Sequence, residues 1–287
     1  MIPALTLLLL ATQQQTPWPD ADWVVLDTKV RWAVSRGLDT VPLGSAIARL
    51  GESFVGARYT PGTLEVPGSE RVVINLQEFD CVTLVENLLA MARFVREDGI
   101  GALADRSAAE RRYAGYIEEL RYRDGRASGY SSRLHYFSEW LADNARRGRI
   151  ELLTERLGGV PRTEPLSFMT SHPHSYRQMA DPGVAREILA VETRLNAGPP
   201  RWAIPEDRIG SLEGRIEDGD IIAATSTLPG LDVAHTGIAV RKDGSLYLLH
   251  APLVGRFVEI SEVPLAERIQ GIRTQDGIMV ARPIQPR

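Results

Sequence analysis

The single cysteine of the chain, Cys81, lies where a thiol could act as a nucleophile. It follows Asp80 and begins an apolar run that no helix-breaking residue interrupts before Gly99, which predicts a helix from Cys81 to about Arg96. A free thiol has a pKa of about 8.5, so it needs help to ionise near neutral pH. Unpaired N–H groups at a helix start supply part of that help and can stabilise an oxyanion. An inert, buried cysteine is the alternative.

Two histidines in the stretch AHTGIAVRKDGSLYLLHAP are the candidate bases. The letters KDG at 242–244 signal a hairpin between two alternating runs. If Lys242 and Asp243 form the loop, His235 pairs with His250. If Asp243 and Gly244 form it, His250 pairs with Gly237. Both registers place the two imidazoles on one face, where one can act as a base and the other can orient it. Either histidine alone could instead be a core residue.

The rest of the chain must supply the elements that hold these residues together. Helical patterns dominate the first two thirds, and after Pro200 short apolar runs alternate with turns, which is typical of antiparallel strands. The predicted class is therefore α+β in one domain, with the apolar helix from Cys81 buried at its centre. The other predicted helices span about 22–36, 42–55, 104–122, 135–147 and 182–198.

Composition excludes several classes of protein. A formal net charge of -4 argues against a general nucleic-acid binder, and no apolar run reaches 18 residues, so no integral membrane span is expected. Residues 1–15 resemble a signal peptide without its positive start, which predicts an exported, periplasmic protein whose domain covers 16–287; a disordered start or a short buried helix is the alternative. His172 and His174 lack a third ligand nearby, and no phosphate loop is present, so neither a metal nor a cofactor is predicted.

Five stretches in order resemble the N-acetylmuramoyl-L-alanine amidase-like branch of the NlpC-type, papain-like cell-wall hydrolases. The resemblance implies a papain-like fold in which the nucleophile helix packs on an antiparallel sheet, with a helical insertion at about 100–150. It implies no cofactor. The stretches are YTPGTLE at 59–65, NLQEFDCVTLVE at 75–86, SRLHYFSEWLADN at 132–144, GLDVAHTGIAV at 230–240, and LLHAP around His250.

The same resemblance implies a role for each matching residue. Cys81 would be the nucleophile, His235 the general base and then acid, and His250 the residue that orients His235. Tyr59 would lie near the thiol and donate to the oxyanion, unless it is only a core tyrosine. Asp80 is first an N-cap, and Asp232 has a turn-forming role as its alternative. The candidate substrate contacts are Asp80, Arg133, His135, Tyr136 and Asp232.

The implied reaction is hydrolysis of the amide between N-acetylmuramic acid and L-alanine, in peptidoglycan or muropeptide fragments. Two alternatives stay open from the sequence. One is an endopeptidase that cuts within the stem peptide with the same three residues, and the other is a cell-wall binding module with an inert cysteine.

Overall fold

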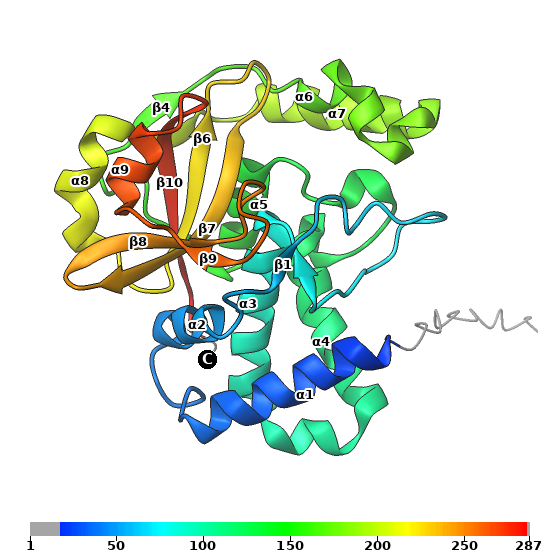
Figure 1. Ribbon diagram of the computed structural model, residues 1–287. Helices are drawn as coiled ribbons and strands as arrows, with labels where there is room; N and C mark the ends of the chain where they lie inside the picture. The colour runs from blue at the N-terminus through cyan, green and yellow to red at the C-terminus, as the bar shows by residue number, and fades with distance from the viewer. Residues whose placement is uncertain (1–17, 286–287) are drawn as a thin grey trace, which may run out of the picture.

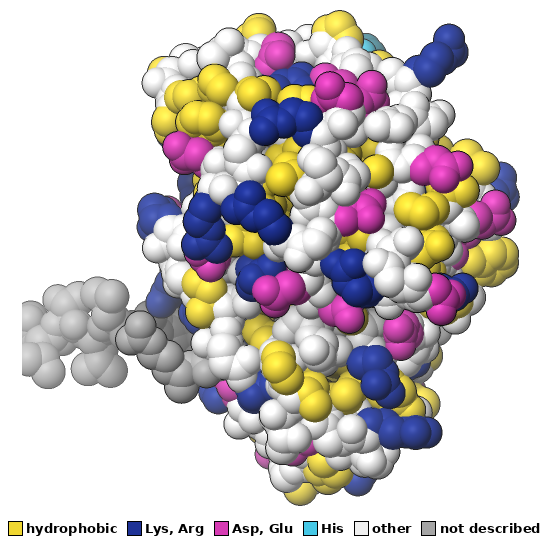
Figure 2. All heavy atoms as spheres, turned by 90° about the vertical axis from the view of Figure 1, so that its left-hand side faces the viewer, with side chains coloured by type: hydrophobic (Ala, Val, Ile, Leu, Met, Phe, Trp, Pro, Cys, Tyr) yellow, Lys and Arg dark blue, Asp and Glu magenta, His cyan; other side chains and the backbone are white. Residues whose placement is uncertain are grey.

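The computed structural model describes residues 18–285, so the predicted leader at 1–15 lies outside it and stays a prediction. Figure 1 shows two parts, a twisted sheet and a group of long helices packed beside it. No helix within residues 18–285 is long and apolar enough to cross a membrane. On the face that Figure 2 shows, Lys and Arg side chains are interspersed with Asp and Glu rather than gathered in one basic patch.

The long helices follow the apolar periodicity of the sequence, and each predicted helix is present to within a few residues. The central one, α3, has buried side chains on nearly every turn and packs against α1, α2, α4 and the sheet. It begins at the cysteine, as predicted. The helices are α1 (Asp20–Ser35), α2 (Leu43–Glu52), α3 (Cys81–Glu97), α4 (Arg106–Arg121), α5 (Phe137–Arg146), α6 (Phe168–Ser171), α7 (Pro182–Asn196), α8 (Ile209–Leu212) and α9 (Leu265–Gln270).

The main sheet is antiparallel in every pairing, which confirms the predicted mixture of helices with an antiparallel sheet. Its order is β4-β5-β10-β6-β7-β8-β9, with β3 pairing a further part of β10. A separate parallel pair joins β1 to β2 just before α3. The strands are β1 (Arg58–Tyr59), β2 (Glu78–Phe79), β3 (Ile150–Leu152), β4 (Val160–Arg162), β5 (Arg201–Pro205), β6 (Ile221–Ser226), β7 (Val233–Lys242), β8 (Ser245–His250), β9 (Glu259–Ile260) and β10 (Gln275–Pro283).

The hairpin of β7 and β8 has the second of the two predicted registers. Lys242 pairs with Ser245, so Asp243 and Gly244 form the loop. Both loop residues have positive φ, 51° and 85°, which matches the twist that a two-residue hairpin requires. This register aligns His250 with the position of Gly237.

Both faces of the sheet are covered, because alternate residues of its central strands enter different cores. Ile238 and Val240 of β7 pack in the large core with α3, whereas Ala239 packs with α9 on the opposite face. A third, smaller core lies under α6 and α7. α3 therefore packs on one face of the sheet at β7, and α9 packs on the opposite face (Figure 1).

The predicted insertion at about 100–150 forms α4 and α5. These helices do not stand apart from the core: Tyr113 of α4 and Trp140 of α5 are fully buried in the same core as α3.

Candidate active site

A capping box fixes the start of α3 around Asp80. The Asp80 Oδ1 accepts the backbone N–H of Thr83 at 2.7 Å, and the Asp80 N–H donates to Thr83 Oγ1 at 2.9 Å. The predicted N-cap is confirmed. The N–H groups of Cys81 and Val82, which belong to the helix start, are not used by this cap, and they remain candidates for stabilising an anion.

A side chain from β7 ties this helix start to the sheet. The Thr236 hydroxyl donates to the backbone carbonyl of Cys81 at 2.8 Å. Because Thr236 directly follows His235, this bond brings the cysteine beside the strand segment that carries the candidate base. Cys81 is partly exposed. The cysteine is therefore held between the end of a helix and a strand.

The two predicted histidines are in direct contact. His235 Nε2 and His250 Nδ1 lie 2.9 Å apart, with the rings nearly perpendicular at 87°. The prediction that both share one face of the hairpin is confirmed. On the far side of His250, its Nε2 lies 3.6 Å from Glu259 Oε1, the residue that faces it across β8 and β9.

Burial sets the protonation of this group. Burial, together with the neighbouring Asp80 charge, raises the pKa of the Cys81 thiol to about 11, although hydrogen bonds from Thr236 oppose the shift. Burial also lowers the pKa of His235 to about 3 and of His250 to about 2, with the Arg268 charge acting in the same direction on both. These shifts favour a neutral thiol and two neutral imidazoles at neutral pH.

Tyr59 lies near Cys81 because β1 pairs with β2. This pairing sets Tyr59 opposite Phe79, two residues before Cys81. Burial, together with negative charge on Cys81 and Asp80, raises the pKa of Tyr59 to about 12. Its hydroxyl therefore keeps its proton at neutral pH and can donate it in a hydrogen bond.

Arg133 is used by the fold, which corrects its prediction as a substrate contact. Its Nε and Nη2 donate to the two carboxylate oxygens of Glu70 at 3.0 and 2.8 Å, and its Nη1 donates to Glu65 at 2.7 Å. The residue is 7% exposed. A guanidinium already paired with two carboxylates has little to offer a third, so Arg133 fastens the loop before β2 instead.

His135 and Tyr136 are likewise structural where the sequence predicted substrate contacts. His135 Nε2 is 2.9 Å from the carbonyl of Tyr130, its ring packs on the Tyr130 ring, and burial lowers its pKa to about 3. Tyr136 is 2% exposed and donates to Glu192 of α7 at 2.7 Å. Its hydroxyl also accepts the N–H of Met169, so it joins α5, α6 and α7.

Asp232 caps α5 from the strand side. Its Oδ2 accepts the N–H of Ser138 at 2.7 Å and its Oδ1 accepts the N–H of Val233 at 2.8 Å. Burial raises its pKa, and the bonds from Ser138 oppose that shift. Asp232 also lines a pocket of about 290 Å³, so both predicted roles, in a turn and at a cleft, have a place in the structure.

Sequence reasoning missed three residues around the histidines. Thr236 and Glu259 contact Cys81 and His250 as described, and Arg268 of α9 carries a charge that acts on both imidazoles. Thr236 had a local signal, since it stands next to His235. The other two had none, because they reach the site only through the pairing of β9 and the packing of α9. Within residues 18–285 no cluster of three potential metal ligands is present.

The fold and site define a mixed α/β protein in which a cysteine at a helix start lies beside a strand that carries paired histidines. A family profile described as N-acetylmuramoyl-L-alanine amidase-like matches residues 49–278, and the chain belongs to this family. A comparison with curated proteins finds no match.

Solved structures agree with this assignment. An N-acetylmuramoyl-L-alanine amidase from Bacteroides uniformis is 34% identical with a TM-score of 0.77, covering 85% of this chain and 99% of its own. A Bacteroides fragilis structure that carries a xylanase name is 35% identical with a TM-score of 0.72, covering 81% and 98%. Protein LPG0564 from Legionella pneumophila, at 18% identity and a TM-score of 0.66, covers 93% and 95% and shows a shared fold only.

Proposed function

We propose that this protein is a cysteine amidohydrolase that cleaves the amide between N-acetylmuramic acid and L-alanine in peptidoglycan fragments. The observation that carries the proposal is the 2.9 Å contact between His235 and His250. The residue that follows His235, Thr236, is hydrogen-bonded to Cys81. The family and the name of the Bacteroides uniformis neighbour support the choice of bond. The helix start packed on an antiparallel sheet supports a papain-like, NlpC-type architecture.

Glu259 favours one arrangement of protons in the histidine pair. A carboxylate 3.6 Å from His250 Nε2 favours a proton on that nitrogen, which leaves His250 Nδ1 as an acceptor. His235 must then donate from Nε2, so its Nδ1 carries the free lone pair. This is the nitrogen that we assign to the thiol proton.

The pKa shifts make His235 a base that acts during attack. Because the pKa of the thiol is raised and that of the imidazole is lowered, the proton stays on sulfur until the substrate arrives. As the sulfur of Cys81 bonds to the amide carbon, the proton moves to His235 Nδ1. The positive charge that forms on His235 is then shared through His250 with Glu259.

The helix start supplies the other half of the chemistry. Attack places negative charge on the amide oxygen, and the N–H groups of Cys81 and Val82, with the Tyr59 hydroxyl, are the donors that we assign to it. His235 returns its proton to the nitrogen of L-alanine, which leaves as a free amine. Water, activated by the same imidazole, then hydrolyses the muramoyl thioester and regenerates the thiol.

Product analysis tests this function. The protein is incubated with a muramoyl-tripeptide and, separately, with the free tripeptide, and the products are identified by mass spectrometry. The proposal predicts free muramic acid and an intact tripeptide from the first, and no reaction of the second. Cleavage inside the tripeptide would instead identify a stem endopeptidase. Cys81→Ala, expected to fold normally, is the matched inactive control.

A further inference from the structure

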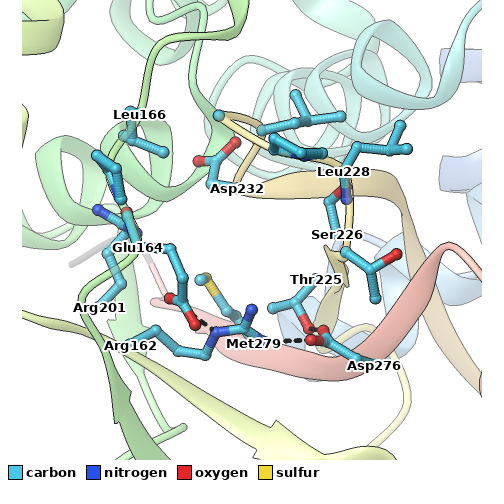
Figure 3. Close-up of a pocket in the computed structure, with 15 residues that line it drawn as sticks. Arg162, Glu164, Leu166, Arg201, Thr225, Ser226, Leu228, Asp232, Asp276 and Met279 are labelled. Carbon is cyan, nitrogen blue, oxygen red and sulfur yellow. Dashed lines mark hydrogen bonds and ion pairs between the residues drawn. The ribbon is translucent and has the colours of Figure 1, made fainter.

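The pocket beside Asp232 is separate from the thiol and histidines, and the mechanism above leaves it without a role. It has a volume of about 290 Å³ and is bounded by β4, β5, β6, β10 and the loop at 228–231. Figure 3 shows its side chains around a common hollow, with Arg201 on one side and Ser226 and Leu228 on the other. Leu166, Leu228 and Met279 give it apolar walls.

The walls of this pocket are fixed by the fold. The carbonyl of Gly230 accepts the N–H groups of Ser167 and Phe168, each at 3.1 Å. Gly230 has a φ of +79°, and a Cβ there would lie 2.6 Å from the Ser167 hydroxyl, so only glycine allows this approach. Asn196 holds the other rim by bonding both backbone groups of Leu166. A pocket that is already formed can bind a ligand without first ordering a loop.

One cation of the pocket, Arg201, forms no close ion pair within residues 18–285, although the charges of Asp232 and Glu164 act on it from farther away. Arg162 is paired with Asp276 at 2.8 Å and with Glu164 at 3.2 Å, and Asp276 also accepts the Thr225 hydroxyl. Arg201 is half-buried, and among residues 18–285 it forms no ion pair; its one hydrogen bond is to the backbone carbonyl of Glu164. A half-buried guanidinium with spare donors is suited to a carboxylate, which it can bind through two parallel hydrogen bonds.

The position of the pocket relative to the nucleophile suggests which carboxylate. Asp232 lies four residues before Thr236, the residue bonded to Cys81, and four residues of extended chain span roughly 13 Å. In a stem peptide that runs in extended form from the scissile amide, the second residue lies closer to that amide than this distance. Its third residue lies about 10–11 Å along an extended chain, and a carboxylate on that residue can span the rest of the distance.

We infer that Arg201 and its pocket bind a carboxylate of the third residue of the stem peptide. This inference rests on the proposed function, because it takes the muramoyl amide at Cys81 as the point from which the peptide runs. It makes the protein selective for fragments that retain three or more stem residues over shorter ones.

Kinetics on substrates of graded length test the inference. The ratio of kcat/KM for muramoyl-tripeptide to that for muramoyl-dipeptide is measured in the wild type and in Arg201→Gln. Loss of a charged hydrogen bond predicts that this ratio falls roughly tenfold or more, with a smaller fall in Arg201→Lys. Arg186→Gln, an exposed arginine of α7, should leave the ratio unchanged. A ratio that is unchanged in Arg201→Gln would overturn the inference, as would an equal loss on both substrates.

A binding measurement separates this inference from the proposed reaction. The free tripeptide is titrated into Cys81→Ala and into Cys81→Ala with Arg201→Gln, and loss of binding in the second supports the pocket whether or not the amide is cut. If Arg201→Gln does not fold, Leu228→Trp is the second variant, because a larger side chain in this exposed loop fills the same hollow. It should lower the tripeptide-to-dipeptide ratio of kcat/KM equally. Tripeptide binding that is indifferent to both substitutions would contradict the assignment.

Discussion

Each imidazole of the site has two nitrogens with different neighbours, and those neighbours decide which nitrogen is the base. His235 gives its Nε2 to His250, so only Nδ1 is left for the thiol. His250 has Nε2 near Glu259 and does not need to carry a proton to and from substrate. The two histidines therefore have unequal roles although their rings touch.

Replacing each histidine by asparagine should separate these roles. His235→Asn removes the base and should lower kcat by roughly 10²–10⁴-fold. His250→Asn keeps an amide oxygen that can accept from His235 and should retain more activity. Steady-state kinetics on a muramoyl-tripeptide compare the two, with thermal melting to confirm that both fold. Equal losses in the two variants would contradict the assignment of His235 as the base.

Glu259 should act on the rate through His250. Glu259→Ala removes the carboxylate that favours the working tautomer. Because this carboxylate lies 3.6 Å from His250 Nε2 without a hydrogen bond, its loss should cost about 0.2–1 kcal/mol and lower kcat by up to about fivefold. Glu259→Gln keeps an oxygen and should lose less. Glu262→Gln, exposed nearby, is the control and should behave as the wild type. An unchanged kcat in Glu259→Ala would show that Glu259 does not influence proton transfer through His250.

The pH dependence of alkylation tests the resting protonation state. With the pKa of the thiol raised to about 11 and that of His235 lowered to about 3, the thiolate is a small fraction at neutral pH. The fraction, and the rate of labelling of Cys81 by iodoacetamide, should rise about tenfold per pH unit between pH 6 and 9. A rate that is already high and flat from pH 5 to 8 would show a preformed thiolate–imidazolium pair instead.

At the scale of elements, one buried ion pair joins the nucleophile helix to α4. Arg121 donates to Glu86 of α3 at 2.7 Å, and the two side chains are 3% and 1% exposed. Arg121 also donates to the carbonyl of Val73, and Trp140 of α5 donates to Glu86. Burial raises the pKa of Glu86, while the Arg121 charge opposes the shift, so the carboxylate depends on its partner to stay ionised.

Breaking this pair should destabilise the fold strongly. Arg121→Met leaves Glu86 buried without its cation, and the free energy of unfolding should fall by about 3–5 kcal/mol. Arg111→Met, on the exposed side of the same helix, should change it by less than about 0.5 kcal/mol. Chemical denaturation of the two variants measures the difference. A change below about 1 kcal/mol in Arg121→Met would show that the pair contributes little to stability.

Features with local causes were predictable from the sequence, and those with distant partners were not. The start of α3 depends on Asp80 and Thr83, and the hairpin depends on its own turn, so both could be located from a few neighbouring residues. Arg133 was misassigned because its carboxylate partners lie 63 and 68 residues earlier in the chain. Glu259 lies opposite His250 only because β9 pairs with β8 after an irregular loop. No sequence pattern predicts that pairing.

At the scale of the whole molecule, the site lies where the helical part meets the sheet. The helix brings Cys81, which we propose as the nucleophile, and β7 and β8 bring the two histidines that we propose as the base and its partner. The loop before β7 leads to the Arg201 pocket. A substrate can therefore contact both parts at once. Export to the periplasm, where peptidoglycan is found, stays a proposal that rests on residues 1–15.

The most direct test of the central claim is the mass of the protein during turnover. A reaction with muramoyl-tripeptide is quenched in acid within its first turnovers, and the intact protein and its Cys81-containing fragment are weighed. The account predicts an increase equal to one muramoyl acyl group on Cys81, absent in Cys81→Ala, because the peptide leaves before the thioester is hydrolysed. An adduct that still carries L-alanine, or a Cys81→Ala variant that cleaves the substrate at the wild-type rate, would contradict it.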